Sequence, residues 1–308
     1  MLSSASTNRE KLQKFYNENI DSLSELYPGI TFERLIQEFE SSWSKGPVER
    51  REILKDCYLE GASHPLNTFF SYLKKGIPLE YISGQSYFYK SEFRVTPDVL
   101  IPRSETEILV EIAVNYLKSK SKEQDTFSIA DIGTGSGNIL LSILQEVDCP
   151  CFAVGLDISP LALAVAKKNH FNLKYRMSPK HHVEWIISDR MGSLYTEDHR
   201  LFDLIVSNPP YIKEKYDRKL VHHKVDQLEP HSALYLKDEE YDQWFALFFQ
   251  QVENKLRPGG MFIMEGHEHH LESLRDLAQS YGLDSENTEI INDYTGRPRF
   301  FTWKRKNG

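Results

Sequence analysis

The chain has 308 residues, a hydrophobic share of 40% and a formal net charge of −8 at pH 7. This length allows one large domain or two smaller ones, and the acidic balance argues against direct binding to nucleic acid, whose phosphates attract basic surfaces. The sequence has no apolar run long enough for a bilayer, no apolar targeting segment and only three cysteines, a pattern that favours a soluble, cytoplasmic protein.

Residues 1–76 are expected to form a small helical domain, because apolar side chains recur there at helical spacing. The first helix should close at Pro28-Gly29, and Thr31 should cap the second. A third helix is expected around residues 48–59, and a shorter fourth helix should follow Pro65. No grouping of catalytic residue types occurs in this part of the sequence.

Residues 77–100 change in character and predict a short β-hairpin linker. β-Prone runs around positions 81–82, 87–89 and 93–95 are separated by Gly84 and polar residues. Beyond them, Ser104 and Glu107 have the spacing of a capping box, so a helix should begin at Ser104. Arg103 precedes this helix and is expected either to fix a substrate-side loop or to form a surface salt bridge.

From residue 126 onward, predicted strands and helices alternate. Strands are expected at residues 127–131, 152–157, 183–188, 202–206 and 261–265, with helices between them. Cys149-Pro150-Cys151 is interpreted as a strand start, and two β-prone runs near residues 290–291 and 300–303 close the chain. Alternating βα units predict an α/β fold with a doubly wound, mainly parallel sheet.

In such sheets ligands bind at the carboxyl ends of the strands, where four features of this sequence should meet. The first is a glycine loop that consists of Gly133, Thr134, Gly135, Ser136 and Gly137. Its glycines allow positive φ and a close approach of backbone to ligand, and the following helix favours an anionic group. Asp157, twenty residues after Gly137, is expected to accept both hydroxyls of a ribose. Asp189, which precedes Arg190, is expected to reach an adenine edge.

The fourth feature is the stretch Asn208-Pro209-Pro210-Tyr211, which follows an apolar strand at residues 204–206. Proline lacks a backbone N–H and restricts the residue before it, so this tip offers carbonyl acceptors with few competing donors. Asn208 adds a side-chain amide, and Tyr211 adds a flat aromatic wall. The tip is suited to holding a planar NH₂ group by accepting both of its hydrogens. The alternative interpretation is a strand terminator followed by a turn.

Two cofactors compete for the predicted pocket. A dinucleotide fingerprint has glycines spaced G-x-G-x-x-G, whereas this loop is spaced G-x-G-x-G and continues with Asn138. Combined with Asp157 and the Asn-Pro-Pro-Tyr tip, this spacing favours S-adenosyl-L-methionine. A nucleotide-shaped fold without any ligand is the remaining alternative.

The segments that carry these features resemble a known family. The run from Asp131 to Gly137, together with the tip at residues 208–211, resembles class I methyltransferases that modify an amide or an exocyclic amine. With residues 78–84, 100–107 and 157–159 added, the chain resembles the HemK/PrmC family, the N5-glutamine methyltransferases of peptide chain release factors. The resemblance runs from about residue 76 to the end of the chain. It departs at Ser104, where the family usually has proline, and at residues 236–239, which lack the family's glycine-rich run.

This resemblance implies a Rossmann-like doubly wound sheet with a C-terminal antiparallel hairpin. It also implies a helical substrate-docking domain at residues 1–76, a β-hairpin linker at 77–100 and a methyltransferase domain at 101–308. The implied reaction transfers a methyl group from S-adenosyl-L-methionine to N5 of the glutamine in the Gly-Gly-Gln motif of class I release factors. The enzyme is expected to act as a monomer.

The resemblance also implies roles for individual residues. The Asn208 side-chain oxygen and the Pro209 carbonyl would each accept one N–H of the glutamine amide, while Pro210 and Tyr211 complete the substrate site and Tyr211 joins the catalytic set. No strong general base is needed, because an N-alkylated amide cation loses its proton readily. The implied cofactor-binding residues are Gly133, Thr134, Gly135, Ser136, Gly137, Asp157, Asp189, Arg190 and Asn208.

Other functions and sites remain open at this point. The alternatives are methylation of a ribosomal-protein glutamine, methylation of adenine N6 in nucleic acid, and a non-catalytic subunit that keeps the cofactor fold. Glu265 is expected either to have a structural role or to contact cofactor or substrate. No metal is expected, and the clustered histidines should lie in solvated loops or at the surface: His181-His182, His222-His223 and His267-Glu268-His269-His270.

Overall fold

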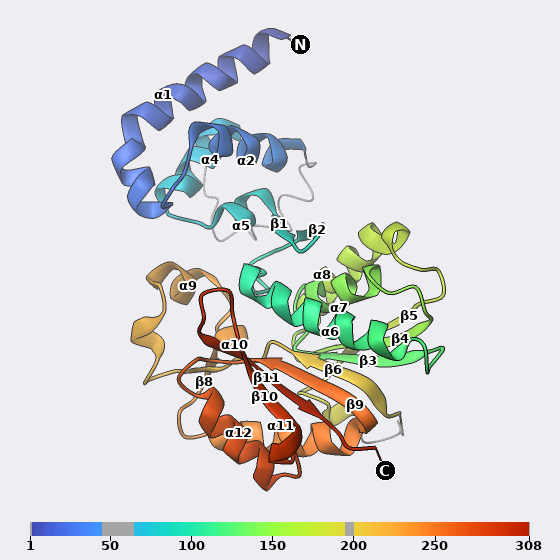
Figure 1. The fold of residues 1–308 in the computed structure, drawn as a ribbon. Coiled ribbons are helices and arrows are strands. Elements are labelled where there is room, and N and C mark those ends of the chain that lie inside the picture. Colours follow the sequence, from blue (N-terminus) through green and yellow to red (C-terminus); the bar gives the residue numbers. More distant parts are fainter. Residues whose placement is uncertain (1, 45–64, 195–199, 308) are drawn as a thin grey trace. The chain divides into compact units, whose positions relative to one another are not determined.

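The computed structural model of the protein describes residues 2–44, 65–194 and 200–307, so the helix expected around residues 48–59 lies outside the described residues. The chain divides into two compact units, which are drawn in Figure 1. The N-terminal unit comprises Met1–Ser86, Val95–Pro97 and His222–Glu229, and the main unit comprises Tyr87–Arg94, Asp98–Val221 and Pro230–Gly308. The domain boundaries expected near residues 76 and 100 stay predictions.

The described part of the N-terminal unit is helical. Its helices are α1 (Leu2–Leu26), α2 (Phe32–Ser44), α4 (Pro65–Lys74), α5 (Leu79–Ser83) and α9 (His223–Leu228). The predicted cap of the second helix is confirmed, because the Arg34 N–H donates to Thr31 Oγ1 at 3.2 Å. The β-prone prediction for Tyr81 and Ile82 is wrong. Both residues are buried in α5, where burial of their apolar side chains outweighs strand propensity.

The predicted hairpin is confirmed by strands β1 (Gln85–Phe88) and β2 (Ser91–Arg94), which form a two-stranded sheet. The predicted capping box is wrong. Residues Ser104–Thr106 form a 3₁₀ turn, and helix α6 begins only at Glu107. The physical reason is that Glu107 Oε1 accepts the N–H of Tyr89 at 2.8 Å, so its carboxylate is committed to the turn of the hairpin.

A seven-stranded sheet forms the centre of the main unit, in the order β10-β11-β9-β6-β3-β4-β5. Its strands are β3 (Phe127–Ile132), β4 (Cys151–Asp157), β5 (His182–Ile187), β6 (Phe202–Ser207), β9 (Leu256–Glu265), β10 (Thr288–Asn292) and β11 (Pro298–Lys304). Strands β5, β4, β3, β6 and β9 are parallel, and β11 runs antiparallel to both β9 and β10. The predicted α/β fold, a doubly wound sheet with a C-terminal antiparallel hairpin, is therefore confirmed.

Helices cover both faces of this sheet (Figure 1). They are α6 (Glu107–Lys120), α7 (Asn138–Gln145) and α8 (Pro160–Leu173) on one face, and α11 (Tyr241–Lys255) and α12 (Leu271–Ser280) on the other. Two buried hydrophobic clusters fill these layers. One is rich in Leu, Ile and Val, and in the other five phenylalanines of α11 and of the sheet strands β9 and β11 pack against one another. The five are Phe245, Phe248, Phe249, Phe262 and Phe301.

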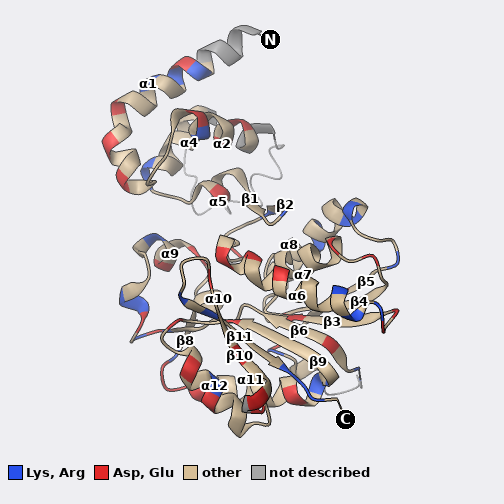
Figure 2. Ribbon diagram, in the orientation of Figure 1, with Lys and Arg blue, Asp and Glu red and all other residues tan. Residues whose placement is uncertain are grey.

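Shorter elements complete the main unit. They are β7 (Ile212–Lys213), β8 (Tyr235–Leu236), α10 (His231–Leu234), and the 3₁₀ turns Lys174–Arg176, Gly192–Leu194, Arg218–Leu220 and Ser285–Asn287. Helix α6 carries acidic residues in its N-terminal half and basic residues in its last turn, whereas the strands of the large sheet consist mainly of uncharged residues (Figure 2). Among the described residues, no helix is both long enough and apolar enough to cross a membrane.

One boundary in the sheet differs from expectation. The sequence Pro258-Gly259-Gly260 was expected to precede a strand at Met261, but it lies inside β9. The Gly259 N–H donates to the Arg305 carbonyl at 3.1 Å, and the Gly260 carbonyl accepts the Arg305 N–H at 3.0 Å. Pairing with the end of the chain therefore extends the strand through residues that usually break one.

Close packing in the sheet depends on a glycine in strand β4. Gly155 is the register partner of Trp185 on β5, and the indole ring lies across it. A Cβ at position 155 would overlap Cε3 and Cζ3 of Trp185, and it would approach Thr134 Cγ2 at 3.3 Å. The missing side chain thus lets Trp185 pack between the sheet and the glycine loop.

We expect Gly155→Ala to lower the free energy of unfolding by about 1–3 kcal/mol, the usual cost of overpacking a core. Urea denaturation measures this change. Gly192→Ala is a matched control, because no heavy atom lies within 4 Å of the Cβ that it adds. Replacing Trp185 by leucine in the Gly155→Ala background should recover part of the loss. Equal unfolding midpoints for the two alanine variants would contradict the packing described here.

Candidate active site

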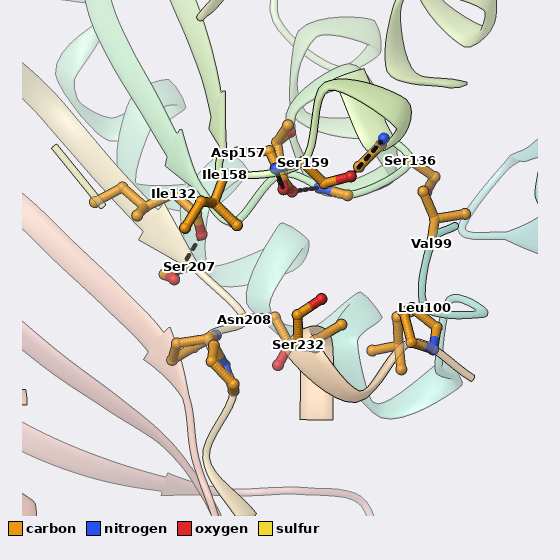
Figure 3. Close-up of a pocket in the computed structure, with 18 of the residues that line it drawn as sticks. Val99, Leu100, Ile132, Ser136, Asp157, Ile158, Ser159, Ser207, Asn208 and Ser232 are labelled. Carbon is orange, nitrogen blue, oxygen red and sulfur yellow. Dashed lines mark hydrogen bonds between the residues drawn. The ribbon is translucent and has the colours of Figure 1, made fainter. Parts of the chain in front are cut away.

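A cavity of about 310 Å³ lies at the carboxyl ends of strands β3, β4 and β6. It brings together most of the residues that the sequence singled out: Gly133, Thr134, Gly135, Ser136, Asp157, Asp189, Arg190, Asn208, Pro209 and Pro210. Figure 3 shows Asp157 and Ser159 beside the glycine loop, with Asn208, Ser232 and Leu100 around the remaining sides of the cavity. Gly137 and Tyr211 do not line it.

The glycine loop between β3 and α7 uses the backbone freedom of its glycines. Gly133, Gly135 and Gly137 have φ values of 70°, 55° and 78°, in the left-handed region that other residues rarely adopt. The N–H groups of Gly133 and Thr134 both donate to the Leu156 carbonyl, at 2.8 and 2.9 Å. The loop is therefore fastened to β4 by its backbone, and its inner edge faces the cavity.

A buried carboxyl group lies at the start of this loop. Asp131 Oδ2 accepts a hydrogen bond from Thr134 Oγ1 at 2.6 Å, whereas Oδ1 has no hydrogen-bond partner among the described residues. Complete burial raises the pKa of Asp131 to about 7, although the hydrogen bond from Thr134 opposes the rise. The folded protein therefore holds this proton far more tightly than an unfolded chain, in which the pKa is near 3.8.

This difference predicts a pH dependence of stability. The protonated Asp131 stabilises the fold below about pH 4, and this contribution is lost as the pH rises towards about 7. Over this range the unfolded chain releases its proton freely, whereas the folded protein must either keep the proton or bury the negative charge. Relative to Asp131→Asn, which stays neutral, the natural protein should lose free energy of unfolding between about pH 4 and about pH 7. Urea denaturation of both proteins across this range, without ligand, measures the effect. A difference that does not change with pH would show that the group is already ionised at the acid end.

Asp157 fixes the glycine loop from the end of β4. Its Oδ2 accepts the Gly135 N–H at 2.9 Å, and its Oδ1 accepts the Ser159 N–H at 2.8 Å. Burial raises the pKa of Asp157, and these two bonds oppose the rise. Each carboxylate oxygen keeps a second lone pair for a ligand. The sequence predicted a carboxylate at this place, but not that it also accepts the backbone N–H groups that fix the loop.

Asp189 and Arg190 lie on another side of the cavity. Arg190 Nη2 donates to Asp189 Oδ2 at 2.7 Å, and the guanidinium lies 4.9 Å from the ring centroid of Trp244 on α11. Arg190 has a positive φ of 50°, and its side chain is largely buried. Trp244, which lines the cavity, was missed because no motif surrounds it.

The Asn-Pro-Pro-Tyr tip begins where strand β6 ends. Ser207 Oγ donates to the Ile132 carbonyl at 2.7 Å, which fastens the tip to strand β3 (Figure 3). Asn208 lines the cavity, and its Nδ2 lies 3.4 Å from Thr106 Oγ1 as a donor. Tyr211 turns away from the cavity, and its hydroxyl donates to Glu265 Oε1 at 2.9 Å.

Glu265, at the end of β9, accepts hydrogen bonds on both carboxylate oxygens. Thr106 Oγ1 donates to Oε2 at 2.6 Å, and Tyr211 donates to Oε1. Burial raises the pKa of Glu265, and both bonds oppose that rise. Burial and the adjacent Glu265 raise the pKa of Tyr211 well above its usual range. The structure thus places Glu265 behind the tip rather than in the cavity lining. Thr106 was missed, although it lies within the run 100–107 that carries the family resemblance.

The histidine predictions are only partly correct. His270, expected in a solvated loop, is largely buried, and its Nε2 lies 2.7 Å from Asp217 Oδ2. His181, expected at the surface, is half-buried with Nε2 3.0 Å from the Leu144 carbonyl. His182, His222, His223 and His269 are exposed as expected. In the part of the chain that the structure describes, no three His, Cys, Asp or Glu side chains are grouped to hold a metal ion.

The sheet order, the glycine loop at its switch point and the carboxylate after the second strand define a class I S-adenosylmethionine-dependent methyltransferase fold. A family model described as a methyltransferase domain matches residues 123–298. The catalytic domain of hMettl16 in complex with MAT2A 3′UTR hairpin 6 shares this fold, with a TM-score of 0.50 and 13% identity over 68% of this chain and 74% of that one.

Comparison with curated proteins narrows the class to one family. The release factor glutamine methyltransferase of Koribacter versatilis is 36% identical over 226 residues, which cover 73% of each chain. That of Flavobacterium psychrophilum is 33% identical over 230 residues, which cover 74% of this chain and 75% of the relative. The chain belongs to the release factor glutamine methyltransferase family.

Proposed function

We propose that this enzyme transfers a methyl group from S-adenosyl-L-methionine to N5 of the glutamine in the Gly-Gly-Gln motif of class I peptide chain release factors. The family to which the chain belongs supports this reaction. The observation that carries it is the position of Asn208, Pro209 and Pro210 on the same cavity as the glycine loop. One cavity therefore offers both an amide-binding tip and a nucleotide-type loop.

The residues at the carboxyl edge of the sheet fit the cofactor. When bound, S-adenosyl-L-methionine supplies an electrophilic methyl group on a sulfonium. The glycine loop offers backbone at close range, Asp157 keeps free lone pairs for ribose hydroxyls, and Asp189 with Arg190 borders the place proposed for adenine. Gly137 shapes the loop instead of lining the cavity.

The tip orients the glutamine amide. An amide nitrogen is a poor nucleophile because its lone pair is delocalised into the carbonyl. If Asn208 Oδ1 and the Pro209 carbonyl each accept one of its hydrogens, the nitrogen is held with its lone pair towards the methyl group. Such orientation can supply several kcal/mol of the barrier, within a ceiling of roughly 7–11 kcal/mol. Tyr211 takes part by supporting the tip through Glu265.

The function is tested by transfer of label from S-adenosyl-L-methionine to a purified release factor. A second reaction uses a release factor whose Gly-Gly-Gln glutamine is replaced. Label that depends on the glutamine supports the substrate and the site of modification together. Label on neither release factor, with cofactor binding shown by calorimetry, would overturn the proposal. It would favour the glutamine of a ribosomal protein or adenine N6 in nucleic acid.

We expect Asn208→Ala to lower the turnover by about 100-fold, the scale of loss when a bound reacting group is misplaced. Binding of S-adenosylhomocysteine, measured by calorimetry, should persist because the glycine loop and Asp157 are untouched. Asn292→Ala, an exposed asparagine on β10 outside the cavity lining, is the matched control. Unchanged turnover in Asn208→Ala would refute the role of this tip.

A further inference from the structure

We propose that Thr106 and Glu265 are positioning residues that set the orientation of the Asn208 amide, so that its oxygen faces the cavity. This inference rests on the proposed function, because it explains how the Asn208 oxygen is turned towards the substrate amide. Glu265 is separated from Thr106 by 159 positions in the sequence, yet their side chains meet behind the tip. Neither residue belongs to the glycine loop or to the Asn-Pro-Pro-Tyr stretch.

The direction of these hydrogen bonds follows from counting hydrogens. An ionised carboxylate only accepts, and a threonine hydroxyl carries a single hydrogen. At 2.6 Å, Thr106 gives that hydrogen to Glu265 Oε2. The hydroxyl oxygen can then only accept from its other neighbour, Asn208, which must present its NH₂ group to it at 3.4 Å. The carbonyl oxygen of the same amide is thereby turned away from Thr106.

Without this constraint the amide would have two orientations. The terminal torsion of an asparagine is broad and roughly two-fold, and its two ends have nearly the same shape. Only one orientation offers an oxygen to the substrate amide. The other would set an NH₂ group against the NH₂ group of the glutamine, donor against donor. A fixed direction therefore decides whether the tip binds its substrate productively.

Burial makes the constraint effective. Thr106 and Glu265 are only 1% and 2% exposed, so water does not compete for their hydrogen bonds. Tyr211 donates to the second oxygen of Glu265, so this carboxylate supports the tip directly through Tyr211 and indirectly through Thr106, which accepts from Asn208. Burial raises the pKa of Glu265, whereas the hydrogen bonds from Thr106 and Tyr211 and the positive charge of Arg299 oppose that rise.

The test compares two substitutions of one residue. Thr106→Val keeps the shape of the side chain and removes the hydroxyl, and we expect the turnover to fall at least tenfold with little change in KM for S-adenosyl-L-methionine. Thr106→Ser keeps the hydroxyl and should recover most of the turnover. Thr302→Val is the matched control: Thr302 is a buried threonine on β11 whose hydroxyl bonds the Glu289 carbonyl, and its loss should leave the turnover unchanged. Equal turnover in Thr106→Val and Thr106→Ser would overturn the proposal.

Glu265→Gln provides a second variant if Thr106→Val does not fold. A glutamine can donate to Thr106, which frees the hydroxyl hydrogen for the Asn208 oxygen and permits the reversed amide. We expect a loss of turnover similar to that of Thr106→Val, with S-adenosylhomocysteine binding retained. Full turnover in Glu265→Gln would count against the proposed direction of the hydrogen bonds.

A measurement that does not depend on turnover separates this proposal from the proposed function. The side-chain NH₂ signals of Asn208 in a nitrogen-15 spectrum of the full chain can be identified by their loss in Asn208→Asp. We expect these signals to shift and to exchange faster with water in Thr106→Val, and to stay close to their native values in Thr106→Ser. Unmoved signals in Thr106→Val would overturn the positioning role. If the Asn208 signals respond to the two Thr106 variants as expected, but the enzyme is inactive on release factors, only the proposed substrate would be overturned.

Discussion

The parallel pairing of strands β3 and β6 is the constraint on which the site depends. Ile132 and Ser207 are register partners at the last rung of this ladder, and the Ser207 hydroxyl donates to the Ile132 carbonyl. Both strands therefore end at the same level, and the glycine loop and the Asn-Pro-Pro-Tyr tip leave the sheet side by side. The carbonyl oxygen of Asn208 lies only 3.8 Å from the place where a Cβ would lie on Gly133. A shift of one residue in this register would separate the two halves of the cavity.

The sequence predicted this arrangement because its physical rule is simple. Alternating βα units produce a parallel sheet, and the carboxyl ends of parallel strands lie at one edge. Every residue that directly follows such a strand was therefore expected at the same edge, and Asp157, Asp189 and Asn208 do line one cavity. The positive φ values of the loop were equally predictable, because glycine is the residue that adopts them without steric cost and the loop has glycine at every second position.

The parts that were missed are those that depend on pairing between distant segments. Ser104 and Glu107 have the spacing of a cap, but Glu107 is bonded to Tyr89, and nothing in the local sequence reveals a partner eighteen positions away. Thr106 and Glu265 lie in distant segments of the sequence, and they meet only because the 3₁₀ turn Ser104–Thr106 and strand β9 come together behind the tip. Local patterns therefore predicted the loop and the tip that face the cavity, whereas Trp244, which also lines it, and the residues that support the tip required the three-dimensional structure.

Two carboxylates do the same physical work on opposite parts of the site. Asp157 accepts backbone N–H groups and fixes the loop, and Glu265 accepts two hydroxyl hydrogens and fixes the tip. An ionised carboxylate cannot donate a hydrogen bond, so each neighbouring group can only donate to it and the direction of each hydrogen bond is fixed. Burial, which keeps water from relaxing that direction, also raises the pKa of both groups. Protonation would turn either carboxylate into a donor and make the direction ambiguous again. The same burial that orders the site therefore also sets the acid side of the pH range in which it stays ordered.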